Sequence, residues 1–262
     1  HQVRIDAHQH FWALKRGDYG WLTPTLAPIY RDFGPGDLYP LLQAQGIDGT
    51  VLVQAAPTDA ETDYMLHLAA ENDFVKGVVG WVDFEGADVG TAIATLAQQP
   101  KLVGLRPMIQ DIDDTDWMLR PALTPALEAM IAHDLAFDAL TLPHHLPNLH
   151  RLLARHPDLR VVIDHGSKPD IASGQIEDWA QDMAALARDT QACVKLSGLV
   201  TEAAPDWTVQ DLAPVTEHLL THFGPTRMIW GSDWPVSTLA STYADWVRAT
   251  DTLLATRSPQ DR

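Results

Sequence analysis

Residues 3–12 read VRIDAHQHFW, a short apolar run that leads into two histidines two positions apart. Side chains alternate between the faces of a strand, so His8 and His10 are expected to point the same way, about 7 Å apart along the backbone. Two imidazoles that emerge together from the end of a strand can bind a metal ion or polarise a carbonyl group. A pair of loop histidines used only for hydrogen bonding is the simpler alternative.

Short runs of strand-forming residues recur after this opening, at 50–54, 77–82, 102–106, 135–140, 160–164, 192–196 and 227–230. The segments between them carry apolar residues at helical spacing, for example Leu149, Leu152 and Leu153. The strand runs are almost continuously apolar, which is typical of parallel strands covered on both faces. Eight strand–helix alternations predict one (β/α)8 TIM barrel over residues 1–262. An open doubly wound sheet is the alternative, but no glycine-rich phosphate loop follows a strand.

The segment 13–36 after the first strand shows no regular pattern and is long for a connection within one domain. Together with Trp12 it contributes five aromatic residues, the others being Tyr19, Trp21, Tyr30 and Phe33. Because aromatic residues are depleted in disordered segments, we predict an ordered loop that covers one end of the barrel.

Composition excludes several classes of partner. The formal net charge is −17, so a nucleic acid or an anionic membrane surface would be repelled. No stretch approaches the roughly 18 apolar residues of a membrane span. Cys193 is the single cysteine, which rules out a disulfide within the chain and predicts a cytoplasmic location. The expected partner is a small molecule, and an oligomer is possible.

Polar residues follow nearly every apolar run, where the C-terminal ends of barrel strands form the active site of TIM-barrel enzymes. They are His8, His10, Gln54, Trp81, Asp83, Arg106, Asp138, Asp164, His165, Lys195, Ser197, Ser232, Asp233 and Trp234. Because a purely structural barrel needs no such ring, this pattern predicts an enzyme. Unpaired burial of a charge in a strand is costly, so we expect Lys195 to face the site or to form an ion pair.

Four blocks carry a resemblance to a known family: residues 3–12, IDHGSKP at 163–169, VKLSGLVTE at 194–202 and MIWGSDWPV at 228–236. Together they resemble the amidohydrolase superfamily, and within it the sugar-lactone hydrolases that act on L-fuconolactone or L-rhamnonolactone. The resemblance implies a distorted TIM barrel that hydrolyses the ester bond of an aldonolactone. It also implies a catalytic site built from four residues: His8, His10, His165 and Asp233.

The resemblance bears on metal ions as well. Metal-dependent members carry a lysine or acidic ligand after strand four and a histidine after strand five, where this chain has Arg106 and Asp138. A guanidinium stays protonated and cannot bind a metal ion, so a binuclear centre is not expected. A single zinc ion on His8, His10, His165 and Asp233 is chemically reasonable. The lactonase branch implies that no metal cofactor is required.

Lactone hydrolysis assigns a role to each residue. Asp233 is the expected general base, and the three histidines would polarise the carbonyl group. The residues expected to bind the sugar are Arg106 as a clamp on its oxygens, and Gln54, Trp81, Asp138, Lys168 and Trp234 as pocket lining. Lys168 could equally form a salt bridge. The alternatives are a metal-dependent amidohydrolase or decarboxylase, a sugar-acid lactone isomerase, and a non-catalytic sugar-acid binder.

Overall fold

The computed structural model describes residues 1–262 and contains one sheet of eight parallel strands in chain order, which confirms the predicted TIM barrel. The strands are β1 (Ile5–Gln9), β2 (Gly49–Val53), β3 (Val75–Gly80), β4 (Leu102–Leu105), β5 (Ala136–Ala139), β6 (Val161–Ile163), β7 (Cys193–Leu196) and β8 (Met228–Trp230). Every predicted strand is present, and the bounds of β2 to β8 differ from the expected ones by at most two residues. The largest shift is in β3, expected at 77–82 and found at 75–80.

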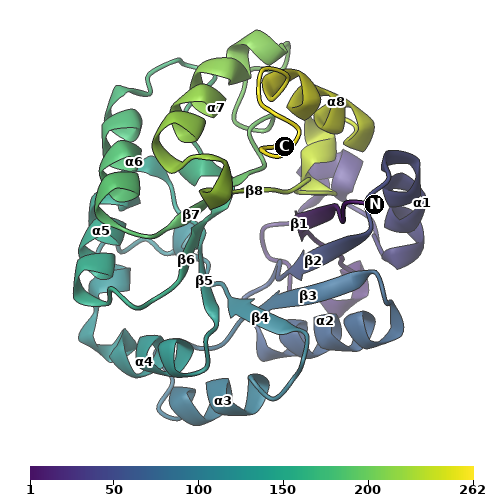
Figure 1. Cartoon of the computed structure of the whole chain (residues 1–262). Helices are drawn as coiled ribbons and strands as arrows, with labels where there is room; N and C mark the ends of the chain where they lie inside the picture. The colour runs from purple at the N-terminus through teal and green to yellow at the C-terminus, as the bar shows by residue number, and fades with distance from the viewer.

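A helix follows each strand, and these helices surround the barrel (Figure 1). They are α1 (Pro35–Gln45), α2 (Asp59–Glu71), α3 (Val89–Leu96), α4 (Thr124–Ala132), α5 (Leu146–Arg155), α6 (Glu177–Asp189), α7 (Val209–Phe223) and α8 (Tyr243–Leu253). The apolar stripes face the core, where Leu149, Leu152 and Trp246 are fully buried. A bilayer-spanning helix is not found, because each helix is too short or too polar.

Nine short 3-10 helices lie in the connections, mostly at the C-terminal ends of the strands. They are η1 (Leu14–Arg16), η2 (Pro24–Ile29), η3 (Ile109–Asp111), η4 (Trp117–Leu119), η5 (Pro121–Leu123), η6 (Pro143–His145), η7 (Asp164–Ser167), η8 (Pro225–Arg227) and η9 (Val236–Leu239). These connections shape the mouth of the barrel above the strands.

The long loop after β1 is ordered, as predicted. Trp12 and Phe33 exchange two backbone hydrogen bonds, of 3.0 and 2.9 Å, which close its base. The indole of Trp21 donates to the carbonyl of Ala55, just after β2, at 2.7 Å. Arg16 forms an ion pair at 2.6 Å with the buried Glu61 of α2. These contacts hold the loop across the ends of β1 and β2.

The barrel closes at a seam between β1 and the segment directly after β8, residues 231–234. There the backbone N–H of Asp233 donates to the carbonyl of His8, and that of His10 donates to the carbonyl of Trp234, both at 2.8 Å. The buried carboxylate of Asp6 accepts from the backbone N–H of Ser232 at 2.9 Å. These bonds stand in place of a regular β1–β8 ladder, so the barrel is distorted, as expected from the family resemblance.

Gly231 allows the close approach across this seam. A Cβ atom at Gly231 would lie 2.7 Å from the Cβ of His8 and 3.1 Å from its backbone nitrogen. Gly231→Ala is therefore expected to lower the free energy of unfolding by about 1–3 kcal/mol, measured by urea denaturation. Gly90→Ala in α3 is the matched control, because nothing lies within 4 Å of its added Cβ and the stability should be unchanged or raised. Equal stability of the two variants would contradict this account of the seam.

Candidate active site

His8 and His10 leave β1 side by side. Their Nε2 atoms are 3.2 Å apart, and the rings meet edge to face with centroids separated by 4.8 Å. Both side chains are buried, and the Nδ1–H of His10 donates to the carbonyl of Val53 in β2 at 2.8 Å. The two imidazoles therefore point to one place, as their spacing predicts.

Asp233 and His165 are directed toward these histidines by unusual backbone geometry. Both residues have φ near 55°, in the left-handed region that non-glycine residues rarely adopt. Each such residue costs about 1–3 kcal/mol and persists only where the surroundings hold it. Ser167, the last residue of η7, and Lys168, which follows it, share this conformation. The strain turns His165, at the end of β6, and Asp233, after β8, inward.

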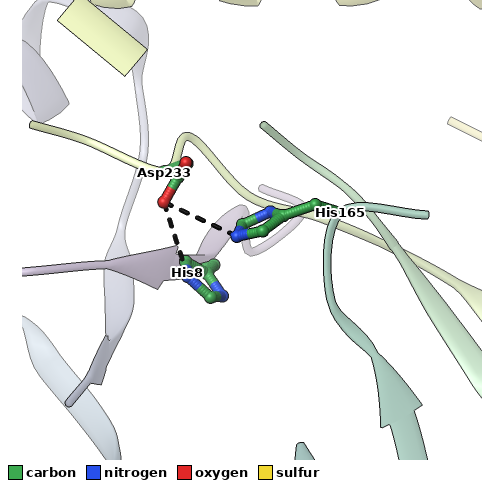
Figure 2. Close-up of side chains that lie close together, drawn as sticks. All are labelled: His8, His165 and Asp233. Atoms are coloured by element: carbon green, nitrogen blue, oxygen red, sulfur yellow. Dashed lines mark ion pairs between the residues drawn. The ribbon is translucent and has the colours of Figure 1, made fainter. Parts of the chain in front are cut away.

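These four side chains form one cluster. The Oδ1 atom of Asp233 lies 3.2 Å from Nε2 of His10, 3.5 Å from Nε2 of His8 and 3.8 Å from Nε2 of His165. Figure 2 shows dashed lines from Asp233 to both His8, on β1, and His165, in the segment after β6. Three imidazole nitrogens thus surround one carboxylate oxygen at the mouth of the barrel.

A layer of buried ions lies beneath the histidines. The Nζ atom of Lys195 is 2.5 Å from Asp138, 3.1 Å from Asp164 and 3.0 Å from Nδ1 of His8. Lys195 is therefore both ion-paired and directed toward the site, the two options that the sequence left open. The carboxylate of Asp138, expected to line the sugar pocket, is instead 2% exposed and bound to this ammonium group.

Arg106 belongs to the same layer. Its guanidinium donates to Oε1 and to the backbone carbonyl of Gln54, at 2.7 and 2.6 Å, and to Asp164 at 3.1 Å. Arg106 and Gln54 are both buried. Their polar groups are thus engaged with each other and with Asp164, whereas the sequence suggested direct contacts to the substrate.

Burial and charge set the protonation states of the cluster. Burial lowers the pKa of His165 to about 4 and holds the pKa of His8 well below its ordinary value. Burial alone would raise the pKa of Asp233, but His165 and His10 beside it keep that pKa below its ordinary value. Burial and the neighbouring Asp164 raise the pKa of Asp138 to about 7. At neutral pH the mouth therefore holds neutral His8 and His165 beside an ionised Asp233.

A cavity of about 710 Å³ opens at the same end of the barrel. Its lining comes from the long loop and from residues that follow β2, β3 and β4, including Trp21, Trp81 and Trp117. None of the four clustered residues lines it, and Trp12 lies between, packed edge to face on Trp21 at 5.3 Å and stacked near His10 at 6.4 Å. The cavity and the cluster are thus neighbouring parts of the barrel mouth.

Two residues expected at the sugar pocket lie elsewhere in the mouth. Trp234 is buried and packs edge to face on Phe11 and Phe33, so it supports the loop and does not line the cavity. Lys168 is half-buried, and its charge lowers the pKa of Glu202, although burial has the larger effect and raises it. Lys168 thus lies near the acidic groups of the mouth.

Asp6 is a buried acid for which the sequence reasoning assigned no role. Its carboxylate accepts from the backbone N–H of His8 at 3.1 Å, from Ser232 and from the hydroxyl of Tyr243, the last two at 2.9 Å. The sequence feature that could have indicated a role for Asp6 is its position inside an apolar strand, two residues before His8. Ser197 also had no assigned role, and its Oγ lies 2.7 Å from Nδ1 of His165.

The cluster fits a zinc ion in part. His8, His165 and Asp233 offer ligand atoms within 4.8 Å of one another, the N and O donors that zinc accepts. The Nδ1 atom of His10 is hydrogen-bonded to the carbonyl of Val53, and that of His165 to the hydroxyl of Ser197. Metal-bound histidines typically have such partners on the ring nitrogen that does not bind the metal. The Nδ1 atom of His8 faces an ammonium group, which can only donate, so His8 lacks that partner.

Removing Arg106 tests the importance of the buried ion layer. Arg106→Met leaves Asp164 with one cationic partner in place of two, so we expect the free energy of unfolding to fall by about 3 kcal/mol. Arg248→Met, which breaks the exposed pair with Asp245, should leave the urea midpoint unchanged. A midpoint for Arg106→Met equal to that of the parent chain would show that the layer does not stabilise the fold.

Comparison with known proteins shows the family of this chain. A family model described as amidohydrolase matches residues 5–262. L-fucono-1,5-lactonase of Burkholderia ambifaria is 51% identical over 93% of this chain and 84% of its own length, and L-fucono-1,5-lactonase of Burkholderia multivorans is 35% identical over 92% and 85%. A crystal structure of a Burkholderia multivorans amidohydrolase with bound zinc is 32% identical with a TM-score of 0.93, over 100% of this chain and 95% of that one. The chain therefore belongs to the amidohydrolase family.

Proposed function

We propose that this protein hydrolyses the ester bond of a sugar lactone, such as L-fuconolactone or L-rhamnonolactone, to the open-chain sugar acid. The similarity to two L-fucono-1,5-lactonases supports the reaction class. The observation that carries the proposal is the contact of one ionised carboxylate, Asp233, with three imidazoles at the mouth of the barrel. A site that only binds a sugar acid has no need of such a base.

Asp233 is the proposed general base. Because its pKa is held below the ordinary value, its carboxylate is ionised at neutral pH and accepts a proton from a water molecule. The water oxygen forms a bond to the lactone carbonyl carbon, and the bond from that carbon to the ring oxygen breaks. The proton then passes from Asp233 to the alkoxide that leaves, so the base is regenerated.

The histidines are the proposed stabilisers of the negative charge on the carbonyl oxygen. A neutral imidazole donates through one nitrogen, and Nε2 of His8 and Nε2 of His165 both face Asp233. A carbonyl oxygen seated beside Asp233 would accept these N–H groups in a site shielded from water, where such bonds are strongest. Of the four residues expected to hold a single zinc ion, His8, His165 and Asp233 have ligand atoms within 4.8 Å of one another, and a bound ion would supply Lewis-acid polarisation.

The sugar is proposed to enter through the cavity beside the cluster. Its volume of about 710 Å³ lies within the range of small-molecule sites, roughly 300–1,000 Å³. The faces of Trp81 and Trp117 suit the C–H surfaces of a sugar ring, and Asp83, Glu85 and Arg120 offer partners for its hydroxyl groups. Of the residues expected to bind the sugar, Trp81 lines the cavity, and Lys168 remains a candidate because its charge contributes to the lowered pKa of Asp233.

A proton-release assay on a panel of sugar lactones, with and without a chelator, tests the proposed function. The parent chain should turn over at least one 6-deoxyhexonolactone, and Asp233→Asn should lose about 10²–10⁴-fold of that rate with an unchanged circular dichroism spectrum. Asp158→Asn, at an exposed position, is the control and should keep the rate. A near-native rate for Asp233→Asn would reject the assigned base, and accumulation of a rearranged lactone would show an isomerase instead.

The pH dependence of the reaction follows from the lowered pKa values. His165, with a pKa of about 4, becomes cationic only near that pH, where its charge would pair with Asp233 and weaken the base. We therefore expect kcat/KM to stay level from neutral pH down to about pH 5 and to fall near pH 4, with a metal chelator present. Initial rates between pH 3.5 and pH 8 measure this profile. An inflection near 6.5 that is assigned to His165 by its absence from His165→Gln would contradict the lowered pKa of His165.

A further inference from the structure

The Nζ atom of Lys195 has three polar neighbours. Its Nζ atom lies 2.5 Å from Asp138 and 3.1 Å from Asp164, two buried carboxyl groups that keep the amine protonated. The third neighbour is Nδ1 of His8, at 3.0 Å. An ammonium group carries only donors, so the nitrogen of His8 that faces it must accept.

From this geometry we propose that Lys195 is a positioning residue that fixes His8 in the Nε2–H tautomer. His8 then presents an N–H group to the site, as the proposed lactonase mechanism requires, and does not present a lone pair. The inference rests on the proposed function only for its catalytic consequence. The proton position itself follows from the contacts of Lys195.

The contact on the other side of His8 agrees with this tautomer. Its Nε2 atom faces Oδ1 of Asp233, an acceptor, at 3.5 Å. The N–H of His8 therefore has a partner on the side of the site. The opposite tautomer would direct an N–H at an ammonium group and a lone pair at the carboxylate of Asp233.

The same contact opposes zinc binding by His8. A zinc ion on Nε2 needs the lone pair there, which places the proton on Nδ1 and against the ammonium of Lys195. Binding would require Lys195 to lose a proton or to leave Asp138 and Asp164. Lys195 thus favours a hydrogen-bonding role for His8 over a ligand role, although His8 lies within ligand distance of His165 and Asp233.

Nuclear magnetic resonance of the metal-free protein tests the tautomer directly. In a long-range ¹⁵N–¹H spectrum of chain labelled at its 12 histidines, His8 is assigned by comparison with His8→Gln. We expect the Nε2 of His8 to show the shift of a protonated nitrogen and Nδ1 that of an unprotonated one. The reverse pattern would overturn the proposal, whatever the protein proves to hydrolyse.

Removal of the lysine tests the link to zinc. Lys195→Met leaves two buried carboxyl groups without their cation, so Lys195→Met combined with Asp138→Asn is the second variant, in case the single one does not fold. We expect either to bind zinc about tenfold more tightly than the parent chain, by competition with a chromophoric chelator. Lys168→Met is the matched control: it removes a positive charge near Asp233, does not touch His8, and should leave the His8 tautomer unchanged.

Two outcomes of these experiments would overturn the role of Lys195. One is an unchanged zinc affinity in the folded lysine variants. The other is an equal gain in zinc affinity in Lys168→Met, which would show that the affinity depends on the overall positive charge near the site and not on the contact of Lys195 with His8. If the tautomer and zinc results stand while no lactone is turned over, the positioning of His8 holds and the proposed function fails.

Discussion

The hydrogen bonds across the seam between β1 and residues 231–234 are the constraint on which the site depends. They join the backbone of His8 and His10 to that of Asp233 and Trp234, so the bonds that close the barrel also place the carboxylate beside the imidazoles. Asp6 adds three accepted hydrogen bonds at the same place. Closure of the fold and assembly of the site are thus one structural event.

Below the seam, the buried ions orient the imidazoles above them. Charges inside a protein are tolerated only where partners offset the loss of water, and here each cation has a carboxylate in contact. Arg106 and Lys195 share Asp164, and Lys195 also reaches Asp138 and His8. The lower layer therefore holds paired ionisable groups, and the upper layer holds neutral His8 and His165 beside an ionised acid.

The fold and the central cluster could be predicted from the sequence because their signals are local. Apolar runs mark the strands, and the C-terminal ends of parallel strands meet at one place, which brought His8, His165 and Asp233 together. The direction of a side chain after a strand is not local. Asp138 lies in β5 and Arg106 directly follows β4, yet they pair with Lys195 of β7 and with Asp164 after β6, because unpaired burial would be costly. The role of Asp6 could not be predicted from the sequence because two of its partners, Ser232 and Tyr243, lie more than 200 positions away.

The sequence separation of the clustered residues has a consequence for how the chain folds. His8 and Asp233 are brought together only when the first strand meets the segment after the last, a contact whose loop-closure entropy is the largest in the barrel. Helices and neighbouring strands form through shorter loops and precede it. Recovered turnover after dilution from denaturant would therefore report the final ring-closing step, and it should lag behind the return of secondary structure.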